Sequence, residues 1–151
     1  MKVVARNKKA HREYQIQDKL EAGLSLRGTE VKSIRLGHVQ LGDAYVQIKD
    51  EEAYLVKANI SVYDKGSWTN HEPSRRRKLL LHKREIRKLQ GKINERGLTV
   101  VPLQMYLNDK GLVKVEIGVG KGKQYHDKRE DLKRRDAARD IQRAMRRGND
   151  R

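Results

Sequence analysis

The sequence predicts a mainly β fold with inserted helices, namely a small OB-like closed barrel followed by a basic C-terminal tail. About six short segments alternate apolar and polar residues, which is typical of strands. Residues 121–151 carry twelve Lys or Arg, six Asp or Glu and few large apolar side chains. Such a segment buries too little apolar surface to offset its ordering entropy, so we expect it to be disordered when free. The predicted division is a barrel domain over residues 1–120 and a tail over residues 121–151.

Two hairpins give the clearest strand signals. Residues 99–107 and 112–119 alternate on either side of the turn sequence Asn-Asp-Lys-Gly at 108–111. Residues 44–50 and 53–60 form a second predicted hairpin around an acidic turn. Antiparallel strands with an inserted helix favour an OB-like barrel, although the pattern does not separate it from other small barrels.

One helix is predicted over residues 83–96, because Ile86, Leu89 and Ile93 share one face and Gly97 can end it. Its opposite face carries a basic stripe of Arg84, Lys88 and Lys92.

A second helix is predicted between Gly28 and Gly37, with Thr29 as its N-cap and Glu30 at the positive end of the helix dipole. Residues 61–74 show little periodicity and are predicted to form a loop.

The N-terminal part is less regular. Residues 1–12 form a predicted basic arm. Alternation at residues 14–16 and 24–26 indicates two short strands, or one bent strand with a bulge near Gly23.

The chain has 36 Lys or Arg against 20 Asp or Glu, a formal net charge of +16. Such an excess attracts polyanions, and nucleic acid is the leading candidate because bound cations release counterions from phosphates. A membrane partner fits less well, since no apolar run approaches the roughly 20 residues of a spanning helix. The N-terminus also lacks the apolar stretch of a signal peptide. We therefore expect a cytoplasmic protein that binds RNA as a monomer.

The sequence offers little for catalysis, and we expect no enzymatic activity, no cofactor and no metal. There is no Cys, and no two of the five His residues have the close spacing of a metal site. The segment Gly-Val-Gly-Lys-Gly-Lys at 118–123 has the wrong spacing for a nucleotide-binding loop. It is predicted to be a flexible, basic exit from a strand.

Basic residues suggest where RNA would bind. The run Arg75-Arg76-Arg77-Lys78 and the stripe on the helix at 83–96 are candidate phosphate contacts. Aromatic residues are sparse, with six Tyr, one Trp and no Phe. Recognition of a folded RNA by its shape and backbone is therefore favoured over stacking on many bases.

The tail can form an amphipathic helix that folds on RNA. Ala138, Ile141 and Met145 share one face, and the other face carries Arg135, Arg139, Arg143 and Arg146. The alternative is a permanently disordered, solubilising tail. His126 could stack on a base or contact phosphate, or it could be a solvated tail residue.

Together these motifs resemble the SsrA-binding protein family, also called small protein B, the partner of transfer-messenger RNA. The resemblance covers nearly the whole chain and is specific through the joint order of its segments. These segments are Asn7 to Ala10 with Tyr14 and Ile16, Glu21 to Gly23, Gly28 to Arg35, Asp43 to Val46, Asn70 to Pro73, Arg77 to Leu81, Gly97 to Leu103 and Gly122 to Arg129.

The resemblance implies an OB-type barrel and a non-enzymatic adaptor of trans-translation. In this family the barrel holds the tRNA-like domain of transfer-messenger RNA, and the complex enters ribosomes stalled on an mRNA that lacks a stop codon. The tail then occupies the decoding region and the empty mRNA channel, so that the nascent chain can be tagged.

The resemblance also implies site residues. Contacts with the tRNA-like domain fall on Glu21, Leu80 and His82, where many members carry Asn instead of His82. Charge placement adds Lys8, Lys9, Arg75, Arg77 and Lys78. The decoding-site residues fall on Gly122 and His126. Other tail residues expected in the decoding region or mRNA channel are Lys123, Asp127, Lys128, Arg129, Arg135, Arg139 and Arg143.

Two other functions remain open from composition. A ribosomal or assembly protein with a basic tail would bind ribosomal RNA directly. A nuclease would need clustered carboxylates for metal, for which the chain offers Glu51 and Glu52 in a turn.

Overall fold

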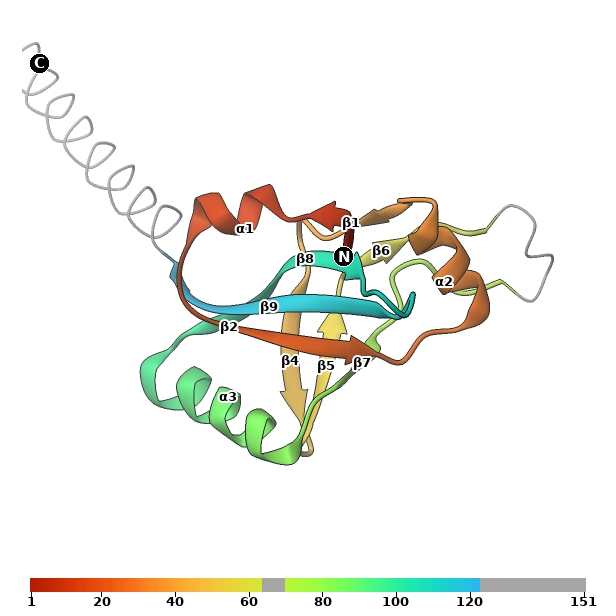
Figure 1. The fold of residues 1–151 in the computed structure, drawn as a ribbon. Coiled ribbons are helices and arrows are strands. Elements are labelled where there is room, and N and C mark those ends of the chain that lie inside the picture. The colour runs from red at the N-terminus through yellow and green to blue at the C-terminus, as the bar shows by residue number, and fades with distance from the viewer. Residues whose placement is uncertain (64–69, 123–151) are drawn as a thin grey trace, which may run out of the picture.

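The computed structural model describes residues 1–63 and 70–122, and this part of the chain is mainly β with inserted helices (Figure 1). The predicted fold class is confirmed at that level. One antiparallel sheet of seven strands has the order β1-β8-β9-β2-β7-β5-β4. These strands are β1 (Lys2–Arg6), β2 (Tyr14–Leu24), β4 (Tyr45–Lys49), β5 (Glu52–Val56), β7 (Arg77–Leu80), β8 (Thr99–Leu107) and β9 (Val113–Gly122). A second, two-stranded sheet pairs β3 (Val39–Gln40) with β6 (Asn59–Ile60).

The main sheet is not closed, so the prediction of a closed barrel is wrong. Its edge strands, β1 and β4, do not pair with each other. Between β8 and the segment before β4, the Asn7 side-chain amide donates hydrogen bonds to the carbonyls of Leu41 (3.0 Å) and Pro102 (2.8 Å). A closed barrel needs a continuous ladder of main-chain hydrogen bonds between its edge strands. Here the buried side chain of Asn7 makes the hydrogen bonds instead of such a ladder. Apolar alternation predicts strands but does not predict which edges meet.

The sheet nevertheless curls around one core. In Figure 1, β4 and β5 cross behind β8 and β9. Val46 and Leu55 from the first pair pack in the same apolar cluster as Met105 and Ile117 from the second pair. A curled sheet of this kind has an inner face toward the core and an outer face away from it.

The helix α3 (Lys83–Arg96) has the bounds that the sequence predicts, and both predicted hairpins are present as β4–β5 and β8–β9. Ile86 and Leu89 are buried in the main core, and Gly97 ends the helix with φ 62°. Within residues 1–63 and 70–122, no helix has the length and hydropathy needed to cross a bilayer.

The helix α2 (Gly28–Arg35) is also confirmed, but its N-cap is Arg27 rather than Thr29. The Thr29 hydroxyl instead lies 2.9 Å from Nδ1 of His71, a buried residue whose Nε2 lies 2.8 Å from the Ile60 carbonyl. A tertiary contact thus uses the side chain that local sequence assigns to capping. The described parts of the predicted loop, 61–63 and 70–74, contain neither helix nor strand.

The predicted N-terminal arm is instead ordered as β1 and a short helix, α1 (Lys8–Glu13). Asn7 caps this helix, since its Oδ1 accepts a hydrogen bond from the Ala10 N–H at 3.0 Å. Ala10 packs against Val101 and Leu103 in a second, smaller apolar cluster. Only one residue of α1 is buried, so the basic composition of the segment conceals the helix.

The segment that follows is a single strand, β2, which confirms the bent-strand alternative. Its register shift lies between Ile16 and Asp18, not near Gly23. Gly23 pairs regularly with Leu80 of β7, and a Cβ added at Gly23 would lie 3.3 Å from the Leu80 Cβ. The glycine therefore marks close packing rather than a bulge.

The glycine-rich segment at 118–122 is not the flexible exit that the sequence suggests, because it forms the last part of β9. A Cβ added at Gly118 would lie 2.8 Å from Leu103 Cδ1 and 3.1 Å from Ile16 Cγ2. Glycine at this position lets the small apolar cluster beneath α1 pack directly on the backbone of β9. The strand also continues through Lys121 and Gly122, two residues beyond the predicted end of the body.

Candidate nucleic-acid interface

The outer face of the sheet carries Glu21 in a row that crosses four strands. Strand register places Glu21 of β2 beside Glu116 of β9, Gln104 of β8 and Arg6 of β1. Directly paired residues of an antiparallel sheet point to the same face. The row therefore presents two carboxylates, an amide and a guanidinium side by side.

A second row lies next to the first and includes Leu80. Gly23 of β2 is flanked by Leu80 on β7 and by Lys114 on β9. Glu21 and Gly23 are two residues apart on one strand, so Glu21 and Leu80 lie on the same face. The structure thus brings together two of the three residues that the resemblance assigns to RNA.

The Glu21 carboxylate is exposed, but one of its oxygens is held in place. The Tyr106 hydroxyl, on β8, donates a hydrogen bond to Glu21 Oε2. The pKa of Tyr106 is raised well above its ordinary value. Burial is the largest cause, and the hydrogen bond to Glu21 and the negative charge of Glu21 add to it. Tyr106 therefore remains a donor at neutral pH. In the described part of the chain Glu21 Oε1 has no hydrogen-bond partner, which leaves it able to accept from a base or a ribose hydroxyl.

Leu80 is an exposed apolar side chain on this face, at 54% of its full accessibility. It lines a cavity of about 250 Å³ together with Leu112, which is 55% exposed, and the two cations Arg35 and Lys114. An apolar floor with a cationic rim suits the face of a base or ribose and its attached phosphate.

His82 lies two residues beyond Leu80, at the N-cap of α3. Its backbone N–H donates to Glu85 Oε1 at 2.9 Å, and the residue is exposed. The helix start therefore fixes its backbone and leaves the ring at the surface.

Arg77 is not a surface cation, which corrects its assignment as an RNA contact. Its side chain is fully buried and pairs with Glu30 of α2. Its guanidinium also donates to the carbonyls of Ala58 (2.8 Å) and Pro73 (2.8 Å). Arg77 is the first residue of β7, so these bonds join that strand to α2, to Ala58 between β5 and β6, and to the segment that precedes it. Arg77 therefore supports the strand that carries Leu80.

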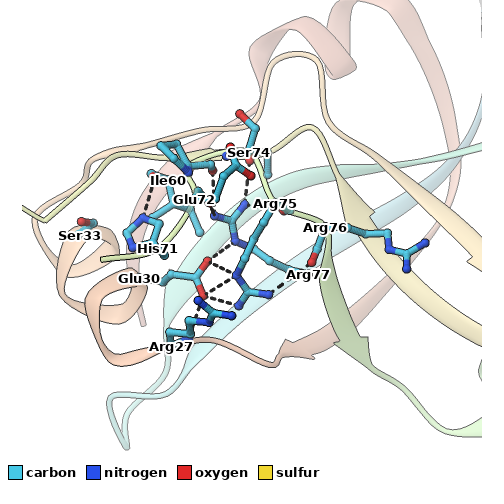
Figure 2. A network of polar contacts seen from close by, with 12 residues as sticks. Arg27, Glu30, Ser33, Ile60, His71, Glu72, Ser74, Arg75, Arg76 and Arg77 are labelled. Atoms are coloured by element: carbon cyan, nitrogen blue, oxygen red, sulfur yellow. Dashed lines mark hydrogen bonds and ion pairs between the residues drawn. The ribbon is translucent and has the colours of Figure 1, made fainter. Parts of the chain in front are cut away.

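Glu30 is the anionic centre of this network, and Figure 2 shows its carboxylate between the guanidinium groups of Arg75 and Arg77. Burial raises the pKa of Glu30, but hydrogen bonds from Arg75, the Arg27 N–H and Arg77 outweigh it, so the net pKa lies below the ordinary 4.5. Burial also lowers the pKa of Arg77. Figure 2 shows Arg76 pointing away from the network, and its guanidinium lies 4.1 Å from the centre of the Tyr54 ring.

Most of the other predicted phosphate contacts are also paired with acids. Lys9 donates to Asp43 at 2.8 Å, which raises the pKa of Lys9 and lowers that of Asp43. Lys78 lies 3.2 Å from Glu52. Of the five basic residues that charge placement adds, Lys8 has no acidic or hydrogen-bond partner among the described residues.

The basic stripe on α3 does not face directly away from the sheet. Arg84, Lys88 and Lys92 line a groove of about 300 Å³ between α3 and β2. Lys92 donates to Asp18 at 2.7 Å, and this hydrogen bond lowers the pKa of Asp18. The helical periodicity of the sequence correctly places these three cations on one face of α3. It does not reveal that β2 lies beside that face.

Sequence reasoning missed Tyr106, Lys114 and Glu116 as parts of the outer face. Their period-two alternation with the buried Met105, Val113 and Val115 could have identified them. Among the described residues no three His, Cys, Asp or Glu side chains come together as a metal site.

The predicted decoding residues are described only at their start. Gly122 is the last residue of β9 and pairs with Tyr14. The others lie outside the described residues, and they are Lys123, His126, Asp127, Lys128, Arg129, Arg135, Arg139 and Arg143.

Comparison with known proteins identifies the family. The family model described as "SmpB protein" matches residues 4–147. An SsrA-binding protein of Nostoc punctiforme is 57% identical over 145 residues, which covers 95% of this chain and 93% of the relative. An SsrA-binding protein of Carboxydothermus hydrogenoformans is 52% identical over 145 residues, with 96% and 97% covered.

A solved chain described as "tmRNA-SmpB: a journey to the center of the bacterial ribosome" has a similar fold. Its TM-score is 0.67 at 46% sequence identity, over 79% of this chain and 83% of that chain. With a family model that matches nearly the whole length and relatives above half identity, this chain belongs to the SmpB protein family.

Proposed function

We propose that this protein is the RNA-binding adaptor of trans-translation, which binds the tRNA-like domain of transfer-messenger RNA and delivers it to stalled ribosomes. The observation that carries the proposal is the outer face, where an exposed carboxylate is held by Tyr106 one row away from the exposed Leu80. A carboxylate weakens non-specific attraction to RNA, so its place on a basic protein fits a role in reading. The relatives named SsrA-binding proteins and the solved tmRNA–SmpB chain support the same partner.

The body is proposed to act as an OB-type domain that grips one RNA. Glu21 accepts from a base amino group or a ribose hydroxyl, Leu80 packs on a base or sugar, and His82 contacts the same RNA from the start of α3. No step in this role makes or breaks a covalent bond, so we propose a non-enzymatic protein without a cofactor. It would act in the cytoplasm with the ribosome.

The tail, residues 121–151, is proposed to bind a different RNA surface. Residues 121–151 contain twelve Lys or Arg and six Asp or Glu. This excess of positive charge suits the RNA of the ribosomal decoding region and of the empty mRNA channel. We propose that it becomes helical there, with Gly122 and His126 at the decoding site and the three arginines Arg135, Arg139 and Arg143 along the channel.

The reading role is tested with Glu21→Ala and the control Glu95→Ala, which removes an exposed carboxylate at the far end of α3. Glu21→Ala should weaken binding to the tRNA-like RNA more than binding to a random duplex, whereas Glu95→Ala should change neither. A uniform loss across both RNAs would contradict reading by Glu21.

The division of labour is tested by truncation after Gly122, so that β9 stays intact. The shortened protein should bind the tRNA-like RNA normally and fail to support tagging on stalled ribosomes. Equal loss of both activities would contradict the division. A ribosomal assembly protein, the main alternative, would retrieve bulk ribosomal RNA from a lysate rather than one dominant small RNA.

A further inference from the structure

Four basic side chains meet at a pocket beside the Glu21 row without neutralising partners. Arg6 comes from β1, Lys8 and His11 from α1, and Lys19 from β2. The pocket has a volume of about 480 Å³. Among residues 1–63 and 70–122, none of these four side chains makes an ion pair or side-chain hydrogen bond.

Other cations of the body are also unpaired among the described residues, such as Lys88 of the α3 groove and Lys114 beside Leu80, but this pocket gathers unpaired basic side chains from three elements. Elsewhere Lys9, Arg75, Arg77, Lys78 and Lys92 are each paired with a carboxylate. Four side chains from three different elements converge here, so the fold rather than a local run of charge assembles the cluster. Mutual repulsion among the positive charges of Arg6, Lys8 and Lys19 is relieved when an anion enters the pocket.

The remaining lining restricts which anion fits and where it lies. Glu116, Gln104 and the buried Leu103 complete the lining on the side of the sheet. The Glu116 carboxylate repels an anion placed against the sheet, so the favourable position is toward Arg6 and Lys8. A planar guanidinium beside two ammonium groups matches the tetrahedral oxygens of a phosphate.

The position of the pocket connects it to the candidate site. Arg6 and Glu21 occupy the two ends of one row across four strands. Three strand spacings separate their backbones by about 14 Å. A few nucleotides of RNA can span that distance, so one RNA segment can reach both ends of the row.

We propose that the pocket formed by Arg6, Lys8, His11 and Lys19 binds a backbone phosphodiester of the same RNA that Glu21 contacts. The proposal rests on the RNA-binding function above and adds to it the phosphate site that sets the position of the RNA along the row. Phosphate contacts of this kind position a nucleic acid, whereas base and ribose contacts specify it.

The first test compares two double variants that each remove two positive charges. Arg6→Gln with Lys19→Gln alters the pocket, and Arg87→Gln with Lys110→Gln alters exposed cations elsewhere on the body. Each lost phosphate contact should reduce the slope of log affinity against log salt by about 0.7 to 0.9. The pocket variant should therefore show a slope shallower by about 1 to 2, and the control should keep the wild-type slope. Equal changes in both variants would overturn the proposal, because they would indicate only the general field of the protein.

The second test identifies the phosphate itself. Single phosphates of a synthetic tRNA-like RNA are replaced by neutral methylphosphonates. At the phosphate that occupies the pocket, replacement should weaken the wild type about tenfold and leave the Arg6→Gln, Lys19→Gln variant nearly unchanged, which corresponds to about 1.4 kcal/mol of coupling. If no position shows this coupling, the pocket does not bind a phosphodiester. If the wild type does not prefer the tRNA-like RNA over a random duplex, the proposed function fails. The comparison of salt dependence can be made on any RNA that binds, so it would still show whether the pocket contacts a phosphate.

Discussion

The Tyr106 hydroxyl on β8 donates a hydrogen bond to the Glu21 carboxylate on β2, although β9 lies between the two strands. An exposed glutamate would ordinarily sample several rotamers, and ordering it on binding costs free energy. Here the protein has already fixed one carboxylate oxygen. The other oxygen is therefore presented to a ligand in a defined direction.

Tyr106→Phe should weaken binding of the tRNA-like RNA about tenfold, or about 1.4 kcal/mol, because Glu21 must then be ordered on binding without the hydrogen bond that holds it. The measurement is affinity for the tRNA-like RNA and for a random duplex. Tyr54→Phe is the matched control, since Tyr54 lies on another strand and has no hydrogen bond to Glu21.

If Tyr106 positions Glu21, the effects of Tyr106→Phe and Glu21→Ala on RNA affinity should not add in the double variant. If Tyr106 acts through Glu21, Tyr106→Phe should have almost no further effect in a Glu21→Ala background. An undiminished loss in that background would show that Tyr106 contacts RNA by another route or only supports the fold.

Acid should destabilise the body through Glu30. Its folded-state pKa lies below the ordinary 4.5, so the unfolded chain binds the proton more readily. The stabilisation is then fully present above about pH 4.5 and is lost as pH falls through the folded-state pKa. Urea unfolding between pH 6 and pH 3 should show this decline in the free energy of unfolding.

The comparison variant for this decline is Glu30→Gln. It should be less stable at pH 6 by about 3 to 5 kcal/mol, because it leaves two guanidinium groups without their anion. Its stability should fall less steeply with acid than that of the wild type. A parallel decline in both proteins would assign the acid sensitivity to other carboxylates, such as Asp18, whose pKa is also lowered.

Two glycine-to-alanine changes should act in opposite directions. Gly118→Ala places a methyl group 2.8 Å from Leu103 Cδ1 and should destabilise the protein by about 1 to 3 kcal/mol. Gly91→Ala, within α3, meets nothing within 4 Å and should stabilise it by about 0.5 to 1 kcal/mol. Thermal unfolding of both variants checks the signs, and a stabilising Gly118→Ala would show that the sheet yields there at no cost.

The candidate site was only partly accessible from sequence. The resemblance located Glu21 and Leu80, and the structure places both on one face. Charge alone could not separate the buried Arg77 from the unpaired Lys8, because it counts cations without their partners. The partner of Arg77 is Glu30, which comes from a distant part of the chain. Lys8 has no partner among the described residues.

By itself, the sequence determined several local elements of this protein, although not α1 or the N-cap of α2. Period-two and helical patterns identified the two hairpins and the bounds of α3, since these depend on neighbours within a few residues. Only the tertiary structure decided that the sheet stays open at Asn7, that Tyr106 holds Glu21, and that Arg6, Lys8, His11 and Lys19 share one pocket. Each of these three features joins segments from different elements of the fold. Strand register sets which side chains meet, and no local sequence pattern encodes that register.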